Sequence, residues 1–309
     1  MTLKQLKVFT HPEGYPQLLA FSPECHLLTW VGYQQGPFIT WDLQTGIQVS
    51  QIIMEERSYV PQAHSITYSG CGTMFGVLFG DIDDRTTAIG TYDILSNKCI
   101  CYHPVKVPVK RTIWTHGEYI QFVSPGPGPP AIWEVGFTSE HPPTEVESLP
   151  IPNDFNPLEK FFLFSTLSRL AYVLGNTILV WDTQCSKLLL DSGDIGGIWN
   201  MTFSSDGHFF AHEVNPTTSG SPEVYLWKES PTGYILHQRF VTIGAIYSDC
   251  GLHFSPNGQS IVLANGPNLQ LWHTTDSIPS PSSSPTKPFQ GIEGFIVEFS
   301  LDRSLVVTA

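Results

Sequence analysis

Short apolar runs separated by turn residues recur along the whole chain. Residues 254–276, FSPNGQSIVLANGPNLQLWHTTD, show the pattern: a turn, an apolar run, a second turn, and a run that ends on a tryptophan. Segments such as LLAF, FITWDL and TILVWD are rich in β-branched and aromatic residues, and several are apolar on both faces. Helical periodicity is missing. The pattern therefore predicts short β-strands in sheets that are covered on both sides.

An aromatic residue followed by serine and a turn marks the start of a repeat. The markers are Phe21-Ser22, Tyr68-Ser69, Phe164-Ser165, Phe203-Ser204, Phe254-Ser255 and Phe299-Ser300, and the degenerate Trp114-Thr115 occupies the remaining position. Their successive spacings are 47, 46, 50, 39, 51 and 45 residues. A period of this length indicates a repeat architecture.

A second marker supports the same period. It follows each of the first six markers after 17 to 24 residues. Its members are Trp41-Asp42, Tyr92-Asp93, Trp133-Glu134, Trp181-Asp182, Trp227-Lys228 and Trp272-His273. Three or four short strands in each period of about 46 residues are typical of one blade of a β-propeller.

These markers resemble those of the WD-repeat (WD40) family. Blades of that family carry Phe-Ser-Pro-Asp-Gly after their first strand and Trp-Asp at the end of their third, and residues 21–46 are a clear copy. The aspartate is replaced in three blades, by Glu134, Lys228 and His273. The resemblance thus implies a seven-bladed propeller whose hydrogen-bonded Trp-Ser-Asp-His sets are incomplete.

A looser resemblance concerns the degenerate repeats and the LKVF segment that precedes them. Together they are similar to the propellers that follow NTPase modules in large fungal signalling proteins. No phosphate-binding Gly-x-x-x-x-Gly-Lys-Ser/Thr loop occurs in this chain. Any such module would therefore lie outside it.

The repeat predicts a single all-β domain over residues 1–309. Its blades centre on residues 21–41, 68–92, 114–133, 164–181, 203–227, 254–272 and 299–309. We expect residues 3–9 to supply the outer strand of the last blade, which then lacks its third strand. Either the sequence is truncated or this blade is irregular, and SLVVTA favours truncation because it ends without a turn. Residues 277–290 are predicted to be a Ser/Pro-rich loop.

Composition narrows the partners and the compartment. The chain has 15 Lys and Arg against 28 Asp and Glu, a formal net charge of −13. This balance argues against binding to nucleic acid or to an anionic membrane, since both attract clustered cations. Six scattered cysteines, with no signal peptide or transmembrane-length window, predict reduced thiols in a cytoplasmic protein.

Loop lengths predict which end of the propeller binds a partner. The turns between first and second strands are tight, whereas long connections gather at the opposite end, which holds the second-to-third and blade-to-blade loops. These connections include 32–37, 80–86, 124–130, 139–158, 213–223 and 277–290. Candidate contact residues there are Tyr33, Asp83, Arg85, Trp199 and Tyr247, because aromatic and Arg side chains dominate interface energies. The alternatives are that the loops are tolerated insertions and that Trp199 and Tyr247 are core residues.

Three segments with catalytic or metal-binding residue types have simpler structural interpretations. His208 and His212 are predicted to lie on a strand, where positions i and i+4 are roughly 13 Å apart and do not share a zinc ion. The Cys-x-Cys-x-His segment at 99–103 is interpreted as thiols of an outer strand. The acidic segment 81–86 lacks the spaced ligands of a calcium loop and is interpreted as a solvated loop.

We therefore predict a non-catalytic scaffold that needs no cofactor or metal and presents its loop-rich end to a protein or peptide. No Gly-x-Ser-x-Gly elbow or kinase signature occurs. The alternative is a propeller enzyme, either a hydrolase or a quinone- or metal-dependent oxidoreductase, with residues that converge on the central channel.

Overall fold

A computed structural model describes most of the repeat. The described residues are 16–32, 36–54, 62–80, 87–105, 113–124, 131–138, 142–148, 161–164, 169–182, 184–185, 187–215, 222–242, 251–255, 257–265, 268–274, 286–289, 297–299 and 306–308. All regular elements in these ranges are β-strands. Nothing in them forms a helix with the length and hydrophobicity of a membrane span.

Six antiparallel sheets of four consecutive strands follow one another along the chain, and we call them blades 1 to 6, with strands a to d. Strands a are β1 (Pro16–Phe21), β5 (Gln62–Tyr68), β9 (Ile113–His116), β13 (Phe161–Phe164), β17 (Gly197–Phe203) and β21 (Gly251–Phe254). Strands b are β2 (Leu27–Gly32), β6 (Met74–Gly80), β10 (Tyr119–Ser124), β14 (Arg169–Leu174), β18 (Phe209–Asn215) and β22 (Ser260–Asn265).

The two outer positions of each blade complete the set. Strands c are β3 (Phe38–Asp42), β7 (Thr87–Asp93), β11 (Ala131–Gly136), β15 (Thr177–Asp182), β19 (Glu223–Ser230) and β23 (Asn268–His273). Strands d are β4 (Gln48–Ile52), β8 (Lys98–Val105), β12 (Thr144–Ser148), β16 (Lys187–Asp191), β20 (Gly233–Val241) and β24 (Thr286–Phe289). Blade 7 is a two-stranded sheet of β25 (Val297–Phe299) and β26 (Val306–Thr308).

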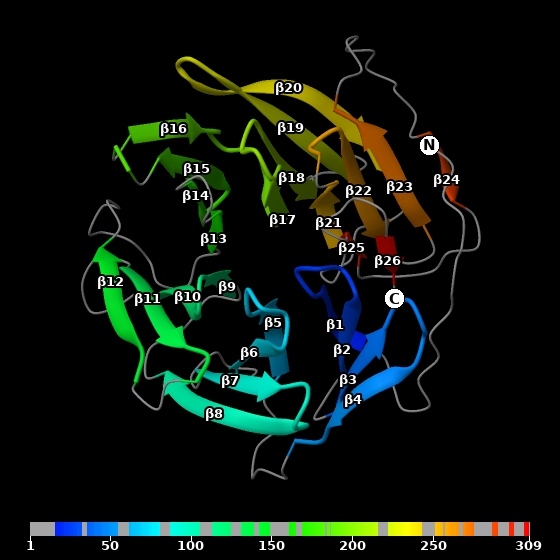
Figure 1. Cartoon of the computed structure of the whole chain (residues 1–309). Coiled ribbons are helices and arrows are strands. Elements are labelled where there is room, and N and C mark those ends of the chain that lie inside the picture. Colours follow the sequence, from blue (N-terminus) through cyan, green and yellow to red (C-terminus); the bar gives the residue numbers. More distant parts are fainter. Residues whose placement is uncertain are drawn as a thin grey trace.

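The blades are arranged around a central axis, with strands a innermost and strands d on the rim (Figure 1). Neighbouring strands a contact one another, as β1 does with β5 and β17 does with β21. Strand β25 lies against both β21 and β1, so blade 7 joins the two ends of the ring. The all-β propeller predicted from the repeat is confirmed.

The two sequence markers meet on strand b. In blade 1, Phe21 and Trp41 both pair with Leu28. The markers of blades 2, 5 and 6 converge in the same way on Phe75, Phe210 and Ile261. In blades 3 and 4, by contrast, Ile113 and Leu163 occupy this register, one residue before the predicted markers Trp114 and Phe164.

The c–d pairing carries a bulge directly before the strand c aromatic. In blade 1, Thr40 pairs with Ser50 and Trp41 with Gln48, which leaves Val49 as the extra residue. The equivalent extra residues in blades 2 to 5 are Ile100, Val146, Leu189 and His237. A bulge twists an edge strand and disrupts its ladder. The rim is thereby protected from pairing with another chain although Val49, Ile100 and Val146 are exposed.

Each described Phe/Tyr-Ser marker also builds the turn that follows it. The serine hydroxyl accepts a hydrogen bond from the first backbone N–H of strand b, as Ser22 does from Leu27 at 3.0 Å and Ser204 from Phe209 at 2.9 Å. The fourth turn residue has a positive φ, which is why glycine stands at 207 with φ 69°. The turn therefore uses the serine hydroxyl in each of these blades and favours glycine at its fourth position, although Cys25 takes the same conformation in blade 1 with φ 57°.

Apolar cores lie between neighbouring blades, and a small polar network joins blades 1 and 2. Tyr68 of blade 2 hydrogen-bonds through its hydroxyl to the buried Thr29 of blade 1, which lies 2.8 Å from Thr40. Among the described residues, the buried indole nitrogens of Trp181, Trp227 and Trp272 have no hydrogen-bond partner. This arrangement agrees with the incomplete Trp-Ser-Asp-His sets that the resemblance implied.

One prediction about the last blades is wrong. Residues 286–289 lie within the predicted loop 277–290 but form β24, the strand d of blade 6. Proline is tolerated there because an outermost strand is paired along one edge only. The remainder of 277–290 and the segment 3–9 lie outside the described residues, so completion of blade 7 by 3–9 stays a prediction.

Candidate functional site

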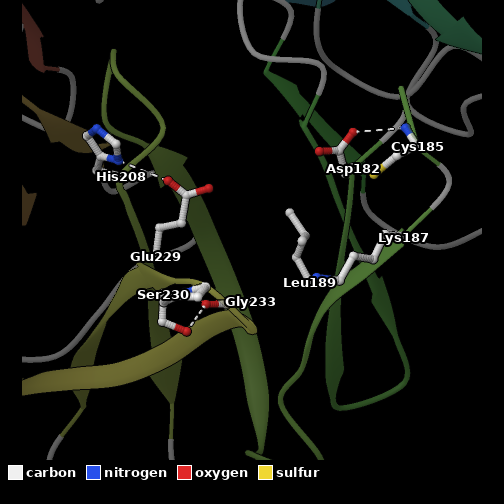
Figure 2. A pocket seen from close by; sticks show the side chains of 9 residues that line it. Asp182, Cys185, Lys187, Leu189, His208, Glu229, Ser230 and Gly233 are labelled. Atoms are coloured by element: carbon white, nitrogen blue, oxygen red, sulfur yellow. Dashed lines mark hydrogen bonds and ion pairs between the residues drawn. The ribbon is translucent and has the colours of Figure 1, made fainter.

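An open groove of about 530 Å³ lies between blades 4 and 5, at the end of the ring that holds the a–b and c–d turns. Figure 2 shows its two walls. Blade 4 contributes Asp182, Cys185, Lys187 and Leu189, and blade 5 contributes His208, Glu229, Ser230, Pro231 and Gly233. The groove is therefore made from strand ends, hairpins and the bulged residue Leu189 of two adjacent blades.

An ion-pair chain joins the two walls. Arg169, the first residue of β14, pairs with Asp182 of the same blade and donates from Nη2 to Glu229 Oε1 of blade 5 at 2.9 Å. Glu229 Oε2 lies 2.9 Å from His208 Nδ1. The side chains of Arg169, Asp182 and Glu229 are 16%, 17% and 29% exposed, so the pairs are partly shielded from water. Such shielding strengthens charge interactions relative to surface pairs.

Local hydrogen bonds keep Asp182 ionised. Its Oδ1 accepts from the backbone N–H groups of Gln184 at 2.9 Å and Cys185 at 3.2 Å. Burial by itself raises the pKa of Asp182, but the Cys185 N–H and the charge of Arg169 outweigh it and hold the pKa below its usual range. The carboxylate is thus a fixed negative charge that Arg169 balances.

The two walls of the groove contact each other where the backbone at Gly233 of blade 5 closely approaches that of Leu189 of blade 4. Gly233 has a φ of 138°, and a Cβ built on it would lie 2.1 Å from the carbonyl oxygen of Leu189. Leu189 is the bulged residue of β16, so the c–d hairpin of blade 5 rests directly on the bulge of blade 4. Next to it, the buried Tyr234 donates its hydroxyl to Gly207 O at 2.5 Å, and burial raises the pKa of this phenol to about 12.

The residues predicted as partner contacts belong to the opposite end of the ring. Tyr33, Asp83 and Arg85 fall in connections between strands b and c, and Tyr247 falls in a connection between blades; all four lie outside the described residues. Trp199 lies in β17, but its side chain is outside the described part. Their role as contact residues therefore stays a prediction.

At that same end, bulges interrupt the innermost strands of blades 1, 2 and 5. The extra residues are Gln17, His64 and the pair 199–200. Gln17 Oε1 accepts from Ala63 N of the next blade at 3.3 Å, and Asn200 Nδ2 donates to the buried Glu213 at 2.9 Å. The His64 ring approaches Gly80 so closely that a Cβ there would lie 2.5 Å from Nε2. Each bulge thus turns a polar side chain toward a strand end or a neighbouring blade.

The prediction that His208 and His212 both lie on a strand is wrong for His208, because β18 begins at Phe209. His208 lies in the a–b turn and is 63% exposed, whereas His212 lies within β18 and is fully buried between Phe210, Tyr225 and Trp227. Cys99 and Cys101 lie on β8 and are not joined in a disulfide. No group of three His, Cys, Asp or Glu side chains suited to a metal ion occurs in the described part of the chain.

Comparison with known proteins identifies the fold. No protein-family model and no curated protein matches the sequence. The β-propeller domain of Cps50 (Swd1) from Myceliophteria thermophila matches with a TM-score of 0.67 and 13% identity over 97% of this chain and 94% of that chain. The C-terminal WD40 domain of Sif2 matches with a TM-score of 0.60 and 15% identity over 97% and 80%. Hydrazine synthase from Kuenenia stuttgartiensis matches with a TM-score of 0.68 and 12% identity over 100% and 99%.

These likenesses show a WD40-type β-propeller fold. That fold is commonly a protein-interaction scaffold, although the hydrazine synthase match shows that it also occurs in enzymes. Sequence reasoning missed the Arg169–Glu229 pair of the groove. A signal was present, because Arg169 stands at a strand b position where blades 1 and 2 have Leu27 and Met74.

Proposed function

We propose that this propeller is a non-catalytic scaffold that binds a partner protein or peptide on the end of the ring carrying the b–c and blade-to-blade connections. The observation that supports this most directly is the set of bulges in strands a, all at that end. Bulges recur beside functional sites because they re-aim side chains. The chemistry needed is recognition, to which a rigid ring contributes by presenting loops with little ordering cost.

The framework beneath the loops agrees with this role. Gly80 ends β6 directly before the loop that carries Asp83 and Arg85, and it is packed under His64 of the bulge. Glu213, near the start of the b–c connection of blade 5, is fully buried and held by Asn200. Loops rooted in braced strand ends present contact residues in a defined geometry.

A pull-down with the whole chain tests the proposal. We expect wild type to capture partners from an extract of its source organism that a Tyr33→Ala/Asp83→Ala/Arg85→Ala variant loses. A matched variant, Glu24→Ala/Lys98→Ala/Glu118→Ala, alters exposed residues at the other end and should capture the wild-type set. Identical partner sets for wild type and the loop variant would remove the proposed surface.

Two further predictions accompany the proposal. The looser resemblance to propellers behind fungal NTPase modules suggests that the scaffold works next to such a module. The scattered cysteines suggest a reducing, cytoplasmic compartment, and the five described ones, including Cys25 and Cys185, are free thiols. Expression of a fluorescent fusion in the source organism tests the compartment.

A further inference from the structure

The a–b turn of blade 6 contains the pair Asn257-Gly258 at the place where blade 5 has Asp206-Gly207. An asparagine deamidates most readily when glycine follows it, because glycine has no side chain to hinder attack by its backbone nitrogen on the asparagine amide. The side chain of Asn257 is exposed, whereas Gly258 is buried. The turn therefore joins a reactive side chain to a backbone nitrogen that the fold encloses.

Both reacting groups of this pair are engaged in hydrogen bonds. Gly258 N donates to Ser255 O at 2.8 Å. Asn257 Oδ1 accepts from Ser255 Oγ at 2.7 Å and from Gln259 N at 3.0 Å, so the side-chain amide is bound to the residue that follows Gly258. Attack of the Gly258 nitrogen on Cγ of Asn257 therefore requires these hydrogen bonds to break.

Contacts outside the turn also fix Gly258. Its carbonyl oxygen accepts from the hydroxyl of Thr274, which follows β23, at 2.8 Å. A Cβ built on Gly258 would lie 3.3 Å from Cβ of Ser204 in blade 5. Because the glycine is held from both sides, its nitrogen reaches Asn257 only when the turn opens, and local opening of a folded chain costs free energy.

The equivalent turn of blade 5 already contains the residue that deamidation produces. Asp206 Oδ1 accepts from Ser204 Oγ at 2.6 Å and from His208 N at 3.0 Å. These are the same two hydrogen bonds that Asn257 Oδ1 forms in blade 6. An aspartate at position 257 therefore fits the turn, and its charge strengthens both bonds. An isoaspartate does not fit, because it adds one carbon atom to the main chain before Gly258.

We propose that Asn257 is a deamidation site whose reaction rate is set by the opening of its turn. When the turn opens, Gly258 N attacks Cγ of Asn257. The N–Cγ bond forms, the Cγ–Nδ2 bond breaks, and the proton of Gly258 N leaves with Nδ2 as ammonia. Water then opens the cyclic imide, either at Cγ to give aspartate or at the main-chain carbonyl carbon to give isoaspartate. Water is the only co-reactant.

The modification adds a negative charge near an existing carboxylate. Both carboxylate oxygens of Asp206 lie 3.7 Å from the position of a Cβ on Gly258, the neighbour of Asn257. The charge changes at the end of the ring that carries the a–b turns, which is opposite to the proposed partner surface. The proposal is therefore independent of the scaffold function.

Incubation of the whole chain at mildly alkaline pH, followed by peptide mapping with mass spectrometry, tests the proposal. We expect Asn257 to react at least about tenfold more slowly in the folded chain than in urea, where the turn does not form. Asn265-Gly266 is the other Asn-Gly pair of the sequence, so in urea it should react at a similar rate and serves as the reference. Ser255→Ala should accelerate the reaction in the folded chain about three- to tenfold, because Asn257 and Ser260 N each lose a hydrogen-bond partner.

Ser22→Ala is the matched control. It removes the equivalent hydrogen bond from Leu27 N in blade 1 and should leave the rate at Asn257 unchanged. Circular dichroism checks that both variants fold, and the comparison of wild type in buffer and in urea needs no variant. Equal rates in buffer and urea, no acceleration by Ser255→Ala, or equal acceleration by Ser22→Ala each overturns the proposal. Reaction of Asn265 but not of Asn257 in urea does so as well.

Discussion

Arg169 of blade 4 donates to Glu229 of blade 5 across 60 residues of sequence, at 2.9 Å. The pair occupies the level of the junction at which Leu27 and Ile94 share the apolar core between blades 1 and 2. One fold thus accommodates either an apolar pair or a partly buried ion pair at the same place. The two kinds of pair differ in the groups that they leave exposed to solvent and to ligands.

The presence of an ion pair at one junction and an apolar pair at another predicts how variants of Arg169 and Glu229 change the free energy of unfolding. Arg169→Leu should lower the free energy of unfolding by about 1–3 kcal/mol, because Glu229 and Asp182 lose a charged donor in a shielded site. The double variant Arg169→Leu/Glu229→Ile copies the Leu27–Ile94 junction and should recover most of that loss. Urea unfolding followed by tryptophan fluorescence measures both variants. A double variant as unstable as the sum of the single ones would contradict the equivalence of the two junctions.

Tyr68 connects blades 1 and 2 by one hydroxyl. Tyr68→Phe keeps the buried ring but leaves Thr29 without that partner, so we expect a loss of about 1–2 kcal/mol in urea unfolding. Tyr119, which is 47% exposed, supplies the control: Tyr119→Phe should change stability by less than about 0.5 kcal/mol. Equal effects of the two substitutions would mean that the inter-blade bond contributes nothing.

Gly233 is required by the contact between blades rather than by its backbone angle alone. A Cβ at this position meets the carbonyl oxygen of Leu189 at 2.1 Å, whereas Gly193 also has a positive φ, 65°, but nothing within 4 Å of an added Cβ. Gly193→Ala should therefore cost about 1–2 kcal/mol from backbone strain. Gly233→Ala should cost about 3 kcal/mol or more, since the hairpin must leave β16. Thermal unfolding of the two variants gives the comparison, and equal losses would contradict it.

The repeat could be read from the sequence because its markers are local. Phe21 and Trp41 meet on Leu28 through two short hairpins, so their spacing is set by turn lengths that recur in other blades. The strand β24 was not predicted because its composition resembles that of a loop. Only its hydrogen-bonded pairing with β23 identifies it as a strand. In blade 4 the marker Phe164 is one residue out of register, which also hid the equivalence of Arg169 with Leu27.

The groove could not be predicted because it depends on long-range placement. Arg169, Lys187, His208 and Glu229 come from two blades, and no short motif links them. His208 drew attention only through its spacing from His212, but the two residues lie in different elements, a turn and a strand. Bulges such as that at Val49 leave no compositional trace, since an apolar residue between polar ones, here Gln48 and Ser50, is also what a regular strand shows. The predicted contacts at the other end remain predictions for a different reason, because their loops lie outside the described residues.

His212 gives the stability of the fold a pH dependence. The ring is fully buried beside Trp227, at 6.2 Å between ring centroids, and neither nitrogen has a hydrogen-bond partner among the described residues. Burial lowers the pKa of His212 from 6.5 to about 3. Below pH 6.5 the unfolded chain binds a proton that the folded chain does not. The free energy of unfolding therefore decreases as the pH is lowered from about 6.5 to about 3. His253, with a pKa lowered to about 4 by burial, adds to the same slope.

Replacing His212 by leucine should remove part of this slope. Between pH 7 and pH 5, the urea midpoint of wild type should fall more than that of His212→Leu, because only the wild-type chain gains the extra proton at this site on unfolding. Val214→Ala, on the same strand and also buried, lowers stability by loss of packing but keeps the histidine, so its slope should match that of wild type. If His212→Leu and Val214→Ala show the same pH slope, the buried ring is not the group that titrates.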